Sequence, residues 1–108
     1  MRLHVANVLF LAALAAGQGK QSFTGVITDS MCATANHAQM RMGPTDPECV
    51  IACVRAHDAV YVLYTGKEAF DLSDQRLPEQ FAGKKVTVTG TVDAKTKTIK
   101  VESITAAK

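Results

Sequence analysis

Hydrophobic and polar residues alternate along much of the chain after residue 20, in the pattern that is typical of short β-strands. Residues 85–92 are the clearest case, because three valines and a glycine alternate there with three threonines. Runs of β-branched and aromatic residues, separated by turn-forming residues, extend the pattern to further strands. We predict strands at 22–28, 60–64, 69–72, 85–92 and 99–104.

Two helical segments are predicted between these strands. Thr45 or Asp46 can cap a helix that has Pro47 at its first position, and we expect this helix over 47–56. A second short helix or turn is expected over 77–81, where a proline enters the segment and a glycine follows it. The first helix lies in a long insertion after strand 1, and the second lies between strands 3 and 4.

The order of the elements predicts a mainly β fold. A strand, an insertion, two strands, a short helix and two final strands follow one another as in a five-stranded OB-like Greek-key barrel. A generic five-stranded sandwich or an open meander is the alternative. Within the last strand, the odd-numbered step from Val101 to Ile104 predicts a β-bulge near Glu102 and Ser103.

The first 20 residues have a different character from the rest of the chain. A short basic start is followed by an almost unbroken apolar run at 5–16, and residues 13–15 offer a small-x-small cleavage pattern. The run is shorter than the ~20 residues that span a bilayer. We therefore expect a signal peptide at 1–20, one domain at 21–108, and a secreted or periplasmic protein without stable membrane insertion after cleavage. The alternative is that this segment is an N-terminal membrane anchor or a buried helix.

Side chains that bind soft metals are concentrated in one part of this domain. All 3 cysteines, and every histidine and methionine after residue 20, fall within 31–57, the Cys/Met/His-rich insertion. Thiolate, thioether and imidazole groups select copper(I), zinc or iron–sulfur clusters. The insertion is therefore the predicted seat of function, and its residues of these types are Met31, Cys32, His37, Met40, Met42, Cys49, Cys53 and His57.

Five of these residues make up the predicted metal site. Cys49, Cys53 and His57 are four residues apart on the expected helix, so they share one face of it. Cys32 and His37 precede that helix and can reach the same ion. The three cysteines with His37 form the tetrahedral set that zinc accepts, whereas the neighbouring methionines favour copper(I). We expect copper or zinc here, and His57 is either a further ligand or a helix cap.

A structural role for the cysteines is the alternative. In small exported domains, pairs of cysteines are usually disulfides. A bridge from Cys32 to Cys49 or Cys53 would stabilise the domain by ~3 kcal/mol, and the third cysteine would be a small buried hydrophobic residue. The alternative function is a disulfide-stapled OB-fold module that binds a glycan or peptide without metal, with Tyr61 or Tyr64 as a stacking residue.

Charge and motifs argue against several other classes of protein. The chain has a net charge of +2 and no basic stripe, so nucleic acid is not an expected partner. It lacks a nucleophile elbow, a phosphate-binding glycine loop and a dinucleotide fingerprint. We expect a non-enzymatic protein that binds a metal ion or small ligand. Five of its aspartates are scattered at predicted turn and cap positions, where carboxylates serve the backbone: Asp29, Asp46, Asp58, Asp71 and Asp74.

Several segments resemble a group of small exported bacterial proteins of unknown function. These segments are FTGVITDSMC at 23–32, ECVIACV at 48–54, a Tyr-Val-Leu strand at 61–63 and FAGKKVTVTGTV at 81–92. The resemblance covers nearly all of residues 21–108. It implies an OB-like barrel with a Cys/His-bearing insertion after the first strand, and it implies no known activity.

Overall fold

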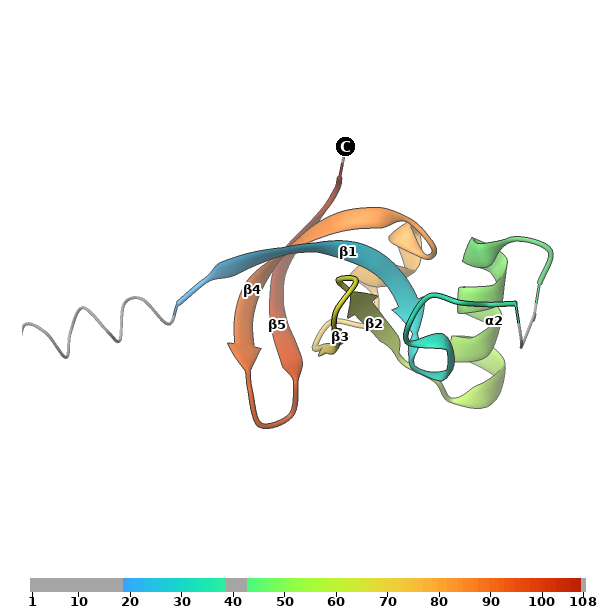
Figure 1. Cartoon of the computed structure of the whole chain (residues 1–108), viewed down its shortest axis with the longest axis horizontal. Coiled ribbons are helices and arrows are strands. Elements are labelled where there is room, and N and C mark those ends of the chain that lie inside the picture. Colours follow the sequence, from blue (N-terminus) through green and yellow to red (C-terminus); the bar gives the residue numbers. More distant parts are fainter. Residues whose placement is uncertain (1–18, 39–42, 108) are drawn as a thin grey trace, which may run out of the picture.

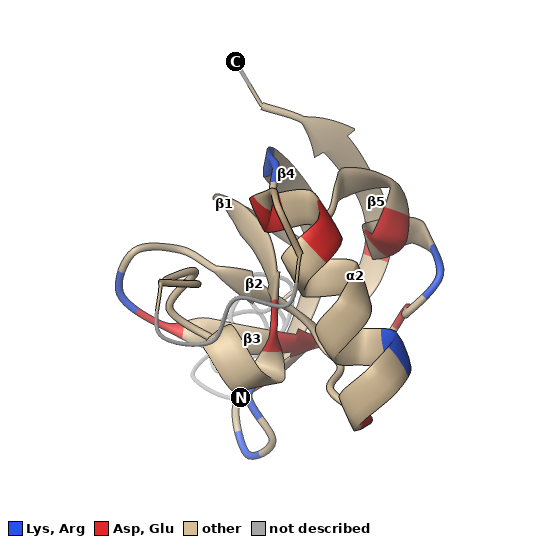
Figure 2. Cartoon of the chain, turned by 90° about the vertical axis from the view of Figure 1, so that its right-hand side faces the viewer, with Lys and Arg blue, Asp and Glu red and all other residues tan. Residues whose placement is uncertain are grey.

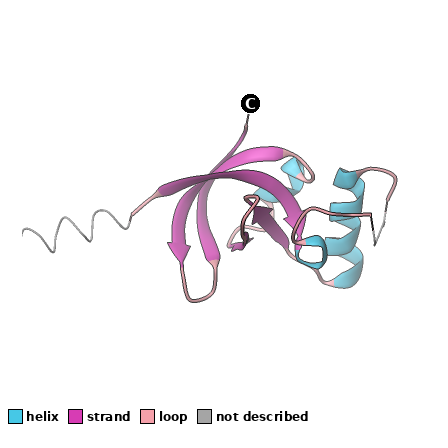
Figure 3. Ribbon diagram, viewed as in Figure 1, coloured by secondary structure: helices cyan, strands magenta, loops and turns pink. Residues whose placement is uncertain are grey.

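The structure is a computed structural model that describes residues 19–38 and 43–107. The predicted signal peptide lies outside the described residues up to position 18, as do Met40 and Met42. The mainly β prediction is confirmed (Figure 3). The elements are β1 (Gln21–Asp29), the 3-10 helix η1 (Ser30–Cys32), α2 (Asp46–His57), β2 (Tyr61–Tyr64), β3 (Ala69–Leu72), the 3-10 helix η2 (Leu77–Phe81), β4 (Lys85–Asp93) and β5 (Thr98–Ala106).

The five strands close into a ring in the order β1-β2-β3-β5-β4 (Figure 1). β1 is long enough to serve two neighbours, because residues 21–26 pair with β4 and residues 26–29 pair with β2. These pairings and the β2–β3 and β4–β5 pairings are antiparallel. A short parallel contact between β3 and β5 completes the ring, so the sheet is not an open meander.

Gly25 marks the point where β1 passes from one partner strand to the other. It pairs with Val86 of β4, and the next residue, Val26, faces both Lys85 of β4 and Tyr64 of β2. A Cβ atom on Gly25 would lie 2.2 Å from the backbone oxygen of Tyr64. No side chain fits at that distance, so the close approach of β1 to β2 requires glycine.

The predicted bulge in the last strand is confirmed. Thr89 pairs with Ser103 and Gly90 pairs with Val101, which leaves Glu102 as the extra residue on β5. A bulge increases the local twist and bends the strand. β5 pairs with β4 along one edge, and its first two residues, Thr98 and Ile99, pair with β3 along the other edge.

Side chains from every strand fill the ring, and α2 covers one of its ends (Figure 1). Val86, Val88 and Ile99 are fully buried, as their place on one face of the alternating pattern predicts. Val50 of α2 belongs to the same core. The remaining buried members of this core are Ile27, Tyr61, Leu63, Phe70, Leu72 and Ala82.

Helix α2 forms where capping signals predict it and is one residue longer at each end. The side chain of Thr45 accepts a hydrogen bond from the backbone N–H of Glu48, and a proline stands in the first turn. The helix ends because Asp58 takes the left-handed conformation, with φ 58°. Arg55 of α2 forms an ion pair with Glu79 of η2. In the described part of the chain, no helix is long and apolar enough to cross a membrane.

Candidate metal centre

Asp29 ends β1 and organises the turn that follows it. Its Oδ1 atom accepts hydrogen bonds from the backbone N–H of Met31 at 3.0 Å and of Cys32 at 2.9 Å. The hydroxyl of Thr28 donates to the carbonyl oxygen of Cys32 at 2.7 Å. These three bonds hold Cys32 close to the end of β1 and bury its side chain.

The segment after η1 folds back so that His37 becomes buried. The N–H of Ala35 donates to the carbonyl oxygen of Cys32 at 2.8 Å, and Ala35 takes a left-handed conformation with φ 62°. The side chain of Asn36 then accepts a hydrogen bond from the N–H of Ala38, at 3.1 Å. This Asx turn brackets His37, whose side chain points inward and is only 4% exposed.

Asp29, Cys32 and His37 therefore meet in one buried group, called here the Asp29 cluster. Each of the three offers one ligand atom, and these atoms all lie within 4.8 Å of one another. Asp29 Oδ2 and His37 Nδ1 are buried and have no hydrogen-bond partner in the described part of the chain. Buried polar atoms without partners are rare and costly. This group of carboxylate, thiol and imidazole can hold a metal ion.

The two helix cysteines lie beside the Asp29 cluster. Cys49 and Cys53 are both fully buried on α2, as their spacing of four residues predicts. Burial is the largest cause that raises the pKa of Cys53 to about 12. The negative charge of Asp29, the nearby thiols of Cys49 and Cys32, and a hydrogen bond with the Asp29 side chain contribute to the same rise. Cys53 is thus a thiol at neutral pH without a cation, and a bound metal ion would reverse this by favouring the thiolate.

His57 is placed differently from the other predicted ligands. It is exposed at the last position of α2, and it does not belong to the Asp29 cluster. Met31 is also exposed, at 43%. The three cysteines carry no disulfide in the described part of the chain. Of the five predicted ligands, the structure brings Cys32 and His37 into the cluster, with Cys49 and Cys53 next to it.

Sequence reasoning treated Asp29 as a turn residue and missed it as a candidate ligand. The turn role is real, because Oδ1 caps η1. A carboxylate has a second oxygen, however, and in Asp29 that oxygen faces the protein interior. The signal in the sequence was an aspartate at the end of a hydrophobic strand, three residues before a cysteine.

Comparison with known proteins gives one similarity. Residues 57–107 match a family model described as "Protein of unknown function (DUF5818)". The matched range begins at the last residue of α2 and includes β2, β3, η2, β4 and β5. It leaves out β1 and the Asp29 cluster. No curated protein and no solved structure matches the chain.

Proposed function

We propose that this protein binds a metal ion, zinc or copper, at the Asp29 cluster, and that it is a non-enzymatic exported protein. The observation that carries the proposal is the pair of buried, unpartnered atoms Asp29 Oδ2 and His37 Nδ1. They belong to residues whose ligand atoms, with that of Cys32, converge within 4.8 Å. A cation bound where these ligand atoms converge would give Asp29 Oδ2 and His37 Nδ1 the partner that each lacks.

The charge of Asp29 supports this proposal independently. Its side chain is completely buried, and no lysine or arginine of the described chain forms an ion pair with it. An uncompensated charge in the interior is strongly unfavourable. A divalent cation bound between Asp29, Cys32 and His37 would neutralise this charge, and it would shift Cys53 toward the thiolate as a fourth ligand.

The donor set favours zinc over copper. Zinc takes thiolate, imidazole and carboxylate ligands together, whereas copper(I) prefers sulfur and nitrogen to carboxylate oxygen. The donor atoms of a tetrahedral zinc site lie about 3.5 Å apart. The ligand atoms of the Asp29 cluster would reach that spacing by moving together by no more than about 1.3 Å. Copper(I) would instead use Cys32, Cys49 and Cys53 with His37, and would leave out the carboxylate.

The frame of the site is proposed to be an OB-like Greek-key barrel. The support is the ring order β1-β2-β3-β5-β4, the parallel contact of β3 with β5, and the position of η2 between β3 and β4. Acidic and basic residues are interspersed around the end that carries α2, without a continuous basic stripe (Figure 2). This distribution supports a partner other than nucleic acid.

Export is proposed from the leader pattern of residues 1–20, and the intact mass of the exported protein tests it. We expect the chain recovered from the periplasm or the medium to begin between Ala16 and Ser22. A mass that still includes residues 1–15 would contradict the proposed cleavage.

Metal binding is tested by titrating the purified, reduced and metal-free chain with zinc and with copper(I) against a chromophoric chelator. We expect one ion per chain, with zinc bound through Asp29. Asp29→Asn is the sharpest variant, because the asparagine oxygen can still cap η1 while the charge and the second acceptor are lost. We expect it to weaken zinc binding at least 100-fold, as Cys32→Ser and His37→Gln should.

His57→Ala is the matched control, since His57 is an exposed histidine of the same insertion, and it should bind zinc like the wild type. Cobalt(II) substitution adds a spectroscopic test, because thiolate ligation gives a charge-transfer band that Cys32→Ser should reduce. Zinc binding that is unchanged in Asp29→Asn would contradict the assigned ligands. Protein from an oxidising compartment that has one alkylatable thiol and no bound metal would favour the disulfide-stapled module.

A further inference from the structure

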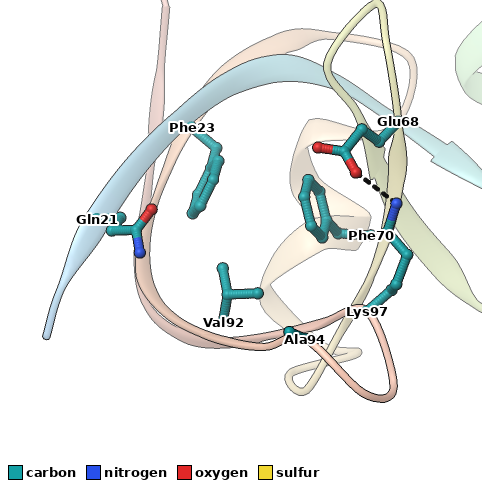
Figure 4. A pocket seen from close by; sticks show the side chains of 7 residues that line it. All are labelled: Gln21, Phe23, Glu68, Phe70, Val92, Ala94 and Lys97. Carbon is teal, nitrogen blue, oxygen red and sulfur yellow. Dashed lines mark hydrogen bonds and ion pairs between the residues drawn. The ribbon is translucent and has the colours of Figure 1, made fainter. Parts of the chain in front are cut away.

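A cavity lies at the end of the ring where β1 begins (Figure 4), and none of its lining residues belongs to the Asp29 cluster. It has a volume of about 470 Å³, which is within the range of small-molecule sites. β1 contributes to both the cavity and the cluster, since Gln21 near its start lines the cavity and Asp29 at its last position belongs to the cluster. The other walls come from the start of β3, the end of β4 and the β4–β5 turn.

Two phenyl rings form the apolar part of this cavity. The rings of Phe23 and Phe70 have their centroids 5.3 Å apart and are tilted by 45°. Phe70 is almost fully buried, but Phe23 and the adjacent Val92 are only half-buried, so part of this apolar surface is open to solvent. Figure 4 shows the three side chains facing the same space. Because the two phenyl rings are tilted, they form an angled surface. Two parallel rings would instead form a flat slot that could hold a planar ligand between them.

Polar groups stand at the rim beside the rings. Lys97 forms an ion pair with Glu68, and its ammonium lies 5.2 Å from the centre of the Phe70 ring. Gln21 adds an exposed amide on the other side of the cavity (Figure 4). One carboxylate and one ammonium cancel each other, so the lining has no net charge and does not select a charged ligand.

We propose that this cavity is a binding site for a neutral glycan. The apolar face of a pyranose ring would stack on Phe23 and Val92, and its hydroxyl groups would hydrogen-bond to the amide of Gln21 and to the Glu68–Lys97 pair. Single-stranded nucleic acid also stacks on aromatic residues, but it requires a positively charged groove for its phosphates. The only ammonium of the lining is already neutralised by Glu68.

The glycan site does not depend on the metal site. The proposed metal ligands lie on the last residue of β1, on the segment 32–37 and on α2, and none of them lines the cavity. Substitutions at the cavity should therefore affect glycan binding alone, and substitutions at the Asp29 cluster should affect metal binding alone.

Nuclear magnetic resonance titration of the full chain tests the proposal. The probes are neutral oligosaccharides of glucose and of N-acetylglucosamine, with oligo-dT as the charged comparison. We expect weak binding of one neutral oligosaccharide, with amide shifts confined to residues near the cavity. Glu68→Ala and Gln21→Ala change exposed rim residues and should weaken binding at least 5-fold. Lys95→Ala changes an exposed lysine of the same β4–β5 turn that does not line the cavity, and it should leave binding unchanged.

Phe23→Ala tests the stacking surface directly, with the amide spectrum as a check that the ring remains folded. Phe23→Leu is the second variant, because it keeps an apolar side chain in the core and removes only the aromatic face. We expect each folded variant to lose at least 10-fold in affinity. The proposal is overturned if no probe shifts the cavity resonances at 10 mM, if oligo-dT binds there instead, or if the shifts map to the Asp29 cluster.

Discussion

Asp29 and His37 each offer a ligand atom, and these two atoms lie within 4.8 Å of each other although the residues belong to different local structures. Asp29 ends a strand, and His37 follows a left-handed residue in the loop beyond η1. Each carries a buried atom without a hydrogen-bond partner in the described residues. Such a pair is unfavourable in the absence of a cation and favourable with one, and this contrast leads to the first prediction.

Zinc should stabilise the wild-type protein against heat, and Asp29→Asn should abolish that effect. A ligand present at 100 times its Kd stabilises the folded state by about 2.7 kcal/mol. Without metal, we expect Asp29→Asn to be as stable as the wild type or more so, because the variant removes an uncompensated buried charge. Thermal unfolding with zinc and with a chelator measures both effects. A lower Tm for Asp29→Asn in chelator would mean that the charge serves only to cap η1.

Val88 and Thr89 are adjacent on β4 but face opposite sides of the sheet. Val88 is fully buried in the ring, whereas Thr89 is partly exposed and its hydroxyl is hydrogen-bonded to that of Ser22. We expect Val88→Ala to lower the free energy of unfolding by roughly 2 kcal/mol through lost burial and the cavity left behind. Thr89→Ala should cost less than about 0.5 kcal/mol. Urea unfolding compares the two, and an inverted order would contradict the assigned faces.

Gly25→Ala should destabilise the ring by roughly 1–3 kcal/mol, because the new methyl group would force β1 and β2 apart. The added Cβ would lie 2.2 Å from the backbone oxygen of Tyr64. Thr24→Ala is the neighbouring control, since Thr24 is exposed and should tolerate the change. Denaturant unfolding of the two variants gives the comparison. Equal stability of Gly25→Ala and the wild type would show that the strands can separate at this point without loss.

The protein should lose stability in alkaline solution partly through Tyr61. Burial, and then the carboxylate of Glu79, raises the pKa of Tyr61 to about 12 from its usual 10.0. The folded state thus holds this proton more tightly than the unfolded state. Its stabilising contribution is full below pH 10 and is lost as the pH rises toward 12, by about 1 kcal/mol at pH 11.

Tyr61→Phe removes this titrating group and should therefore flatten the decline. Unfolding free energies measured from pH 7 to pH 11 in metal-free protein test the difference in slope. Part of the decline should remain in the variant, because the raised pKa of Cys53 acts in the same direction from pH 9 upward. Identical slopes for the variant and the wild type would contradict the role of Tyr61.

The strands, the helix and their order follow from the sequence because they depend on neighbouring residues. Period-two alternation predicted β4. The capping residue Thr45, followed by a proline in the first turn, predicted α2. The odd step between Val101 and Ile104 predicted the bulge at Glu102. In each case the information lies within a few residues along the chain, which is the range over which propensity, alternation and capping act.

The composition of the two candidate sites was decided by tertiary structure. His57 continues the spacing of Cys49 and Cys53, yet the helix ends there and its side chain remains in solvent. Asp29 becomes a candidate ligand only because folding buries its second oxygen beside Cys32 and His37. The sequence located the insertion in which the candidate ligands Cys32, His37, Cys49 and Cys53 lie. Burial and convergence arise from long-range packing, so local patterns could not select the members of the candidate site.

The cavity near the start of β1 is another feature that tertiary structure decided and local sequence patterns did not. The sequence suggested that one of Tyr61 and Tyr64 lies in the core and that the other is a stacking residue. Tyr61 is the core residue, and neither tyrosine lines this cavity. The aromatic rings that line the cavity are those of Phe23 and Phe70, which are far apart in the sequence. Only closure of the ring brings the start of β1 next to β3, because strands 1 and 3 do not pair and meet solely across its interior.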